Sequence, residues 1–151
     1  MVSKKTVSIL GMVVCLFFLL SPLTNLNAAD TTIPFISSID EILKANPMEA
    51  GKNVQLIKIA ETDTVTVYIV RSTEGYFLKP HVHKTHEESV YVIQGAGQML
   101  INDKWVDIQP GSVHFNPVGK VHSIRHAGSG PLVVLSVFTP AMKVTDRHFV
   151  D

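Results

Sequence analysis

The stretch GYFLKPHVHKTHEESVYVIQG, residues 75–95, decides how this chain folds and what it binds. His81 and His83 lie two positions apart, so on a β-strand their side chains point to the same face. Residues 84–87 are polar and typical of a turn, which lets the chain reverse. The reversal brings Glu88 back beside the two imidazoles at the start of the next strand. Two imidazoles and a carboxylate are thereby placed to share one metal ion.

A second stretch, GSVHFNPVGKVHSIRH at residues 111–126, supplies a further imidazole. Pro117 and Gly119 form a turn that opens another strand, and His122 follows just after it. His122 is therefore placed to be the fourth ligand. Burying three imidazoles and a carboxylate together without an ion would be costly, which favours metal ligation over a hydrogen-bonded cluster.

These two stretches resemble the paired motifs of the cupins, a family of small β-barrels that includes germins and many bacterial metalloenzymes. The first motif is complete from its opening glycine to its closing glycine, and the second is complete as far as its histidine. The resemblance implies an all-β fold, an antiparallel jelly-roll β-barrel. It also implies a metal site whose ligands are His81, His83, Glu88 and His122.

The chain departs from the second motif at its last position, where the family usually has Asn and this chain has His126. His126 lies four residues beyond His122, so regular strand geometry points both side chains inward. The imidazole of His126 could serve as a catalytic acid or base near neutral pH, hold a ligand-bound water, or fill the barrel. The sequence leaves these three roles open.

Three imidazoles and one carboxylate suit one divalent transition metal per chain: iron, manganese, nickel, cobalt or zinc. The donor set alone does not choose among these ions. Four protein ligands on an octahedral ion leave two positions for water, dioxygen or substrate, whereas a tetrahedral zinc would be filled. A catalytic ion would act as a Lewis acid and a template, and iron or manganese could also handle oxygen.

Residues 1–29 have the layout of a secretory signal peptide, with two lysines near the start and small residues at the end. The apolar run at residues 7–20 is shorter than the ~20 residues that a membrane span usually needs. An uncleaved anchor is one alternative, and lipidation at Cys15 is another. Val14 is bulkier than the residue that a lipoprotein cleavage site requires. We therefore expect an exported protein, periplasmic or secreted, with no stable membrane span after cleavage.

Cleavage near residue 29 would leave one compact domain of about 122 residues. Cys15 is the only cysteine, so the exported part has no disulfide. Its 11 basic and 13 acidic residues give a net charge of −2 with the histidines neutral. No basic block or stripe remains, which argues against nucleic acid as a partner.

Residues 30–53 are expected to form an N-terminal arm, in which residues 37–41 resemble a capping box for a short helix that Asn46 ends. Residues 54–151 are expected to form the barrel. In the strand at residues 64–71, apolar and polar residues alternate only in part, as expected for a strand that is covered on both faces. The expected strands, separated by turn residues, are 54–60, 64–71, 76–82, 89–94, 98–101, 105–109, 112–116, 121–126 and 132–138.

The three remaining histidines carry weaker signals. His86 lies in the turn between the ligands, where a solvent-facing side chain is favoured over one that supports a ligand. His114 precedes the second motif and could face the cavity or pack outside it. His148, near the end of the chain, is expected at the surface.

The resemblance implies an exported metalloenzyme that acts on a small oxygenated organic molecule, with dioxygenase-like cleavage favoured over lyase or isomerase chemistry. A non-catalytic domain that binds or senses a small ligand through the metal is the main alternative, and a purely structural metal is a third. The fold does not choose among them. Small cupins commonly dimerise, and residues 54–60 and 132–138 are expected as apolar outer strands that need cover, so a homodimer is expected.

Overall fold

A computed structural model describes residues 35–150 of the 151-residue chain. The expected signal peptide at residues 1–29 lies outside the described residues. Within residues 35–150, no helix is long and apolar enough to cross a membrane.

The one helix of the described residues is α1 (Ile39–Ala45), and it begins at the capping box that the sequence predicts. The Ser38 hydroxyl accepts a hydrogen bond from the backbone N–H of Glu41 at 3.2 Å. The Glu41 carboxylate in turn accepts one from the backbone N–H of Ser38 at 3.0 Å. Each side chain satisfies a backbone donor that the first turn of a helix leaves free. The helix stops at Asn46, as expected.

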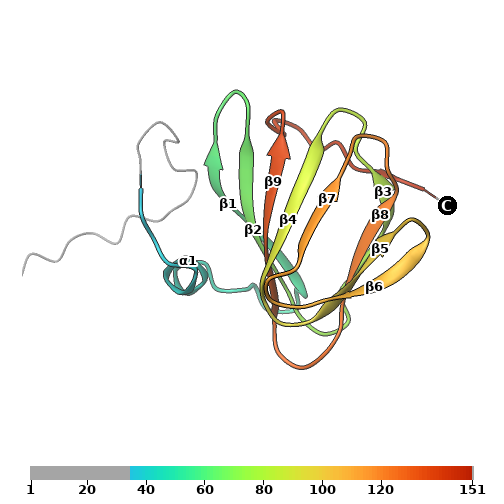
Figure 1. Ribbon diagram of the computed structural model, residues 1–151. Coiled ribbons are helices and arrows are strands. Elements are labelled where there is room, and N and C mark those ends of the chain that lie inside the picture. Colours follow the sequence, from blue (N-terminus) through green and yellow to red (C-terminus); the bar gives the residue numbers. More distant parts are fainter. Residues whose placement is uncertain (1–34, 151) are drawn as a thin grey trace, which may run out of the picture.

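The described residues form ten strands in two antiparallel sheets (Figure 1). One sheet has the order β1-β2-β9-β4-β7 and the other has the order β10-β3-β8-β5-β6. The all-β jelly-roll fold with a short N-terminal helix is thereby confirmed. The strands are β1 (Val54–Glu61), β2 (Thr66–Ser72), β3 (Phe77–Val82), β4 (Glu87–Gln94), β5 (Gly97–Ile101), β6 (Lys104–Ile108), β7 (Val113–Asn116), β8 (His122–His126), β9 (Leu132–Thr139) and β10 (His148–Phe149).

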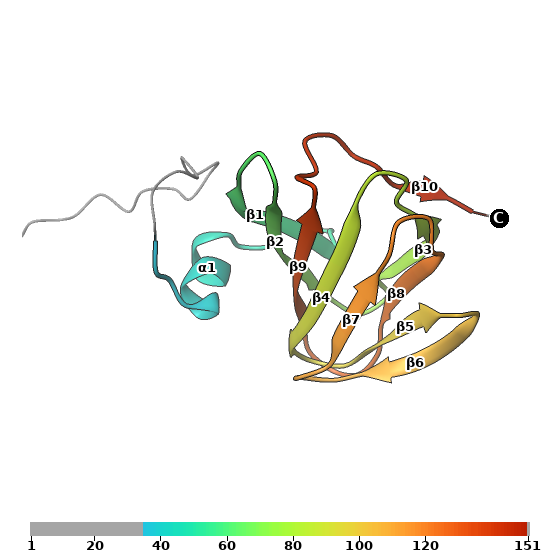
Figure 2. The ribbon, with the colours of Figure 1, turned by 45° about the horizontal axis from the view of Figure 1, so that its top comes forward.

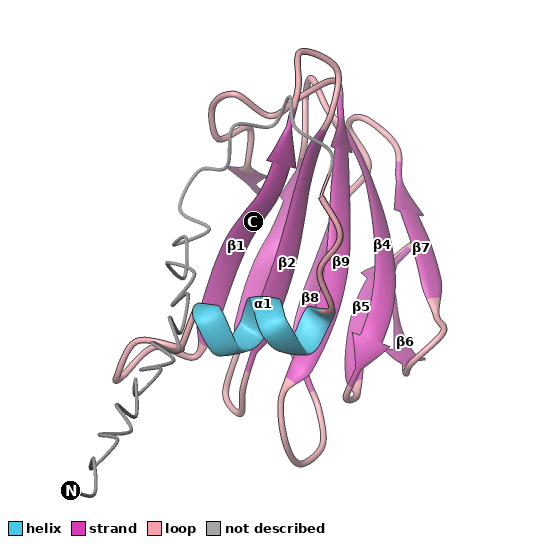
Figure 3. Cartoon of the chain, turned by 90° about the vertical axis from the view of Figure 1, so that its left-hand side faces the viewer, coloured by secondary structure: helices cyan, strands magenta, loops and turns pink. Residues whose placement is uncertain are grey.

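The core has two parts, one on each side of the first sheet. Val90, Val92, Met99 and Leu132 belong to a buried cluster that gathers side chains from both sheets. The second cluster packs α1 against the outer face of β1, β2 and β9, where the helix lies across the strands (Figure 3). Its buried members are Ile42, Ile57, Ile69 and Val133. The incomplete alternation of β2 follows from this arrangement, because one face of the strand meets the helix and the other the barrel interior.

The structure corrects one expectation about the sheet edges. Residues 132–138 were expected as an outer strand that needs cover, but β9 lies in the middle of its sheet, between β2 and β4. Val133 is fully buried beneath α1, and Leu132 is buried on the opposite side. The apolar run therefore reflects two covered faces within one chain. The homodimer stays a prediction.

The sequence did not predict β10, which pairs with the edge of β3 (Figure 2). His148 pairs with Val82 and Phe149 pairs with His81. The N–H of Val150 extends the contact by donating to the carbonyl of Pro80 at 3.0 Å. A two-residue strand is too short for any periodicity to indicate it. Its consequence is that the end of the chain lies beside the strand that carries two predicted ligands.

Candidate metal centre

Three strands bring the four predicted ligands together. His81 and His83 come from β3 and the residue after it, and His81 is the cross-strand partner of His122 on β8. Glu88 comes from β4 in the opposite sheet, because the chain crosses between the sheets at residues 84–86. The neighbouring Glu87 is exposed at the surface. The four side chains thus converge on the space between the sheets.

The imidazoles form a tight, buried cluster. The ring centroids of His81 and His122 lie 4.2 Å apart, and His83 lies 5.2 Å from His81 and 5.1 Å from His122. One ring nitrogen of each histidine lies within 4.8 Å of those of the other two. The Glu88 carboxylate approaches from the opposite sheet, with Oε2 3.4 Å from His122 Nε2 and 3.9 Å from His83 Nε2.

The backbone fixes which nitrogen of each ring is free. His81 Nδ1 lies 3.0 Å from the carbonyl oxygen of Lys79, and His122 Nδ1 lies 3.0 Å from that of Lys120. His83 Nδ1 lies 2.8 Å from the carbonyl oxygen of Asp146. A carbonyl oxygen can only accept, so each Nδ1 carries a proton and each neutral ring keeps its lone pair on Nε2. This is the second hydrogen bond that metal-binding histidines usually make.

Burial keeps the imidazoles in the form that binds metal. Desolvation, aided by the charge of nearby His122, lowers the pKa of His81 to about 4. Desolvation also lowers the pKa of His83. For Glu88, burial alone would raise the pKa of the carboxyl, but contact with His122 and His83 outweighs burial and lowers it. Asn116 Nδ2 donates to Glu88 Oε2 at 3.0 Å. The neutral imidazoles of His81 and His83 therefore face an ionised Glu88 carboxylate at neutral pH.

The arrangement fits a divalent transition metal. Within the described residues, His122 Nε2 is buried and has no hydrogen-bond partner. An unpaired buried nitrogen of this kind costs stability unless something binds it. Three nitrogen lone pairs around one point, with a carboxylate beside two of them, are donors that suit iron, manganese, nickel, cobalt or zinc. His81, His83 and His122 are the residues that could hold the ion, with Glu88 beside them.

The cluster forms part of the wall of a cavity inside the barrel. Much of the wall is apolar, so few groups besides the ligands can form hydrogen bonds to a molecule in it. Tyr76, Ser136 and Arg147 add polar groups from three different parts of the chain. The full lining is Leu56, Val70, Ser72, Tyr76, Leu78, His81, His83, Glu88, Val90, Met99, His122, Ser123, Ile124, Leu132, Val134, Ser136, Phe138 and Arg147.

The structure does not bring His126 to this site. His126 is not among the residues that line the cavity, and its Nε2 lies 2.7 Å from the carbonyl oxygen of Gly130. Strand β8 ends at His126, so the ring turns toward the loop at residues 127–131 and leaves the inward alternation that holds for His122. An acid or base role for His126 therefore finds no support in its position and stays a prediction.

His114 and His86 support the site from outside the cavity. His114 Nε2 contacts the side-chain oxygen of Asn116, whose amide holds Glu88. His86 is buried, although the sequence favours a solvent-facing side chain. The reason is that the C-terminal segment covers it: His86 Nδ1 lies 2.9 Å from Asp146 Oδ2. Its Nε2 lies 3.2 Å from the carbonyl oxygen of Ala141.

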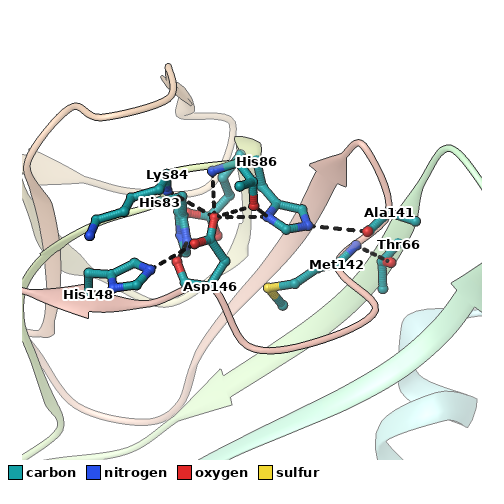
Figure 4. A network of polar contacts seen from close by, with 10 residues as sticks. Thr66, His83, Lys84, His86, Ala141, Met142, Asp146 and His148 are labelled. Atoms are coloured by element: carbon teal, nitrogen blue, oxygen red, sulfur yellow. Dashed lines mark hydrogen bonds and ion pairs between the residues drawn. The ribbon is translucent and has the colours of Figure 1, made fainter.

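Asp146 ties the C-terminal segment to the loop between His83 and Glu88 (Figure 4). Its Oδ2 accepts from the backbone N–H of Lys84 at 2.9 Å and from that of Thr85 at 2.7 Å. The hydroxyl of Thr85 donates to the same oxygen at 2.7 Å. Burial would raise the pKa of Asp146, but hydrogen bonds from His86 and Thr85 hold it well below its usual range. The backbone carbonyl of Asp146 contacts His83 Nδ1, and its carboxylate holds the backbone of Lys84 and Thr85. One residue therefore fixes both a predicted ligand and the loop that follows it.

We expect Asp146→Ala to weaken metal binding by about 10–100-fold, as loss of groups that orient metal ligands usually does. The loop at residues 84–86 loses its carboxylate anchor, so His83 and Glu88 are held less firmly. A competition titration against a chelator measures the change. Asp63→Ala removes an acid whose side chain is fully exposed and is the matched control. Equal affinities in the two variants would mean that the loop holds its shape without Asp146.

Sequence reasoning missed Asp146, Arg147 and Tyr76. Asp146 and Arg147 follow the last long strand by several residues and carry no motif, so only the fold shows that they meet the site. Tyr76 is the second residue of the stretch that decides the fold, but it is not a motif position, so nothing in the sequence marks it. Of Tyr68, Tyr76, Tyr91 and Trp105, only Tyr76 lines the cavity.

The cupin domain family (Cupin_2) matches residues 68–138, which contain all four predicted ligands. A protein of Aquifex aeolicus, named only as uncharacterized, is 27% identical over 120 residues, 77% of this chain and 93% of that protein. A glucose-6-phosphate isomerase of Thermococcus onnurineus is 33% identical over 72 residues, which are 43% of this chain and 38% of that enzyme.

Among solved structures, a conserved protein of Klebsiella pneumoniae with a double-stranded β-helix domain has the same fold. The TM-score is 0.62 with 23% identity, over 72% of this chain and 87% of that one. The chain is thus similar to the cupin domain family over residues 68–138, and its two antiparallel sheets share the fold of this neighbour.

Proposed function

We propose that this protein is an exported metal-binding cupin, a metalloenzyme that acts on a small oxygenated organic molecule by dioxygenase-like or related chemistry. One observation carries the proposal: three imidazoles, each held at Nδ1 by a backbone carbonyl, leave Nε2 free beside the Glu88 carboxylate at the wall of a cavity. Such a site holds an ion where a small molecule can reach it.

The residues at this site would have different roles. The imidazoles of His81, His83 and His122 would hold the ion, and Glu88 would supply a negative charge beside it. Asn116 keeps the Glu88 carboxylate in place, and much of the surrounding wall is apolar. When bound, a divalent metal would supply Lewis acidity and, for iron or manganese, access to oxygen chemistry.

The similarity to a glucose-6-phosphate isomerase adds weight to catalysis over simple binding. That relative is an enzyme whose substrate, by its name, is small and rich in oxygen. The match covers 72 residues, so the chain spans only 38% of that enzyme's length. Isomerisation of a small sugar phosphate is accordingly a second reaction class for the same site.

The test is elemental analysis and activity of protein purified from its native compartment. We expect about one transition metal per chain, a first residue close to Asp30, and turnover in a panel of small acids, diols, phenols and sugar phosphates followed by oxygen uptake and product analysis. Stripping the metal should abolish turnover, and returning the native metal should restore it. Mg²⁺ is the control ion, because it prefers oxygen ligands and should not restore activity.

Two outcomes would count against the proposal. Protein that carries no transition metal, and takes up none, would remove the metal site. Metal-loaded protein that binds members of the panel without converting any of them would identify a binding or sensing domain.

A further inference from the structure

Arg147 lies on the wall of the same cavity, between two fixed points of the C-terminal segment. On one side, Asp146 is anchored to the backbone N–H groups of Lys84 and Thr85. On the other side, β10 pairs with β3 (Figure 2). The backbone at Arg147 is therefore held from both directions, as a residue that must meet a ligand requires.

The guanidinium of Arg147 lacks a partner within the described residues. Its Nε is buried without a hydrogen bond, and it forms no ion pair with any carboxylate of residues 35–150. The Glu88 carboxylate, on the same cavity wall, accepts a hydrogen bond from Asn116 and forms no ion pair with Arg147. Arg147 is half-buried, and its buried Nε has no acceptor, so an incoming anion would supply the acceptor and the counter-charge that this side chain lacks.

The other two arginines of the chain are engaged differently. Arg71 donates through Nη2 to the carbonyl oxygen of Asn46 at 2.8 Å. Arg125 donates through Nε to Gln98 Oε1 at 2.8 Å and stacks 4.2 Å above the ring of Trp105. Arg71 Nε is also buried without a partner, but the planar groups of Arg71 and Arg125 each have a structural partner at another atom. The guanidinium of Arg147 has none within residues 35–150, and Arg147 lines the cavity.

Arg147 and the ligand cluster line the same cavity, to which His81, His83 and His122 also contribute. One small molecule inside that cavity can therefore face both the guanidinium and the imidazoles. A guanidinium binds carboxylate and phosphate oxygens in pairs, which neutral groups in the same wall cannot do.

We propose that Arg147 binds the anionic group, a carboxylate or a phosphate, of the small molecule that enters the cavity. This inference rests on the proposed function, because it places that molecule beside the metal centre. It narrows the substrates to small oxyanions and makes Arg147 a binding residue for them.

The experiment measures binding of three probes to the metal-loaded protein by calorimetry: glycolate, inorganic phosphate and the uncharged glycolamide. We expect wild type to bind at least one of the two anions, and Arg147→Met to weaken that binding about tenfold or more. Arg147→Lys should restore part of the affinity because it returns the charge without the paired donors. Glycolamide binding should not change. A preference for glycolate or for phosphate identifies the anionic group.

Each variant is checked for metal content and for its circular dichroism spectrum, and the titrations are repeated on metal-free protein. These checks separate the two proposals, since a missing metal contradicts the proposed function and an unchanged anion affinity contradicts the role of Arg147. Equal affinity of wild type and Arg147→Met for the anions would overturn the inference. Failure of wild type to bind either anion, with metal or without, would overturn it as well. If Arg147→Met does not fold, Arg147→Gln and Arg147→Lys are compared with wild type by the same criterion.

Discussion

Protein that carries both His81→Ala and His83→Ala is expected to bind its metal at least about a hundredfold more weakly than wild type and to be purified without it. The reason is that two of the four donors are gone, whereas loss of a single outer hydrogen bond to a ligand already costs about 10–100-fold. Only His122 and Glu88 remain as donors, with His122 Nε2 3.4 Å from Glu88 Oε2. Elemental analysis of protein purified under identical conditions gives the answer.

The matched control is His126→Asn, which removes an imidazole that bonds to the loop at Gly130 and does not line the cavity. It should keep the metal at the wild-type level. Because the double variant loses two buried side chains, its fold is checked by circular dichroism. Both variants should keep their strands. Stoichiometric metal in the double variant would mean that the ion binds elsewhere on the chain.

The substitution Gly95→Ala is expected to destabilise the fold by roughly 4 kcal/mol or more, a large part of a typical domain's stability. Gly95 has a φ of +82°, and a Cβ there would lie 2.2 Å from the carbonyl oxygen of Pro131 and 2.8 Å from the Cα of Leu132. These are backbone atoms at the start of β9 and cannot turn aside as a side chain does. Thermal unfolding should show a fall in Tm of about 10–20 °C.

Gly130→Ala is the control because Gly130 has the same φ, +82°, and open space around the position of a Cβ. It should cost only the about 1–2 kcal/mol of placing an alanine at that φ. The difference between the two variants isolates the contact with β9. Absence of soluble Gly95→Ala protein beside well-folded Gly130→Ala protein would agree with the prediction. Equal Tm values would show that β9 can shift to make room.

The positions of the ligands could be inferred from the sequence because each depends on residues that are near it in the chain. Alternation along one strand places His81 and His83 on one face, and a short polar loop returns Glu88 to them. The turn before His122 sets the start of β8, and the register then pairs His122 with His81. The helix was predictable for the same reason, since its capping box spans Ser38 to Glu41.

Contacts between distant parts of the chain were not predictable in this way. His86 looked like a surface residue because the segment that buries it lies 60 positions later, at Asp146. Residues 132–138 looked like an edge strand because their apolar run does not reveal that α1 covers one face. Regular alternation also failed at His126, where the strand ends and the ring turns to a nearby carbonyl.

The bond from His83 to the carbonyl of Asp146 joins residues 63 positions apart, and it closes the metal centre with a segment that is synthesised well after the strands that carry the ligands. The site therefore cannot be complete until Asp146 has been synthesised and the segment around it has docked beside β3. For a chain exported unfolded, this docking would take place outside the cytoplasm. The ion that the centre acquires would then be selected by the metal supply of the outer compartment, and cytoplasmic metal would have no finished site to occupy.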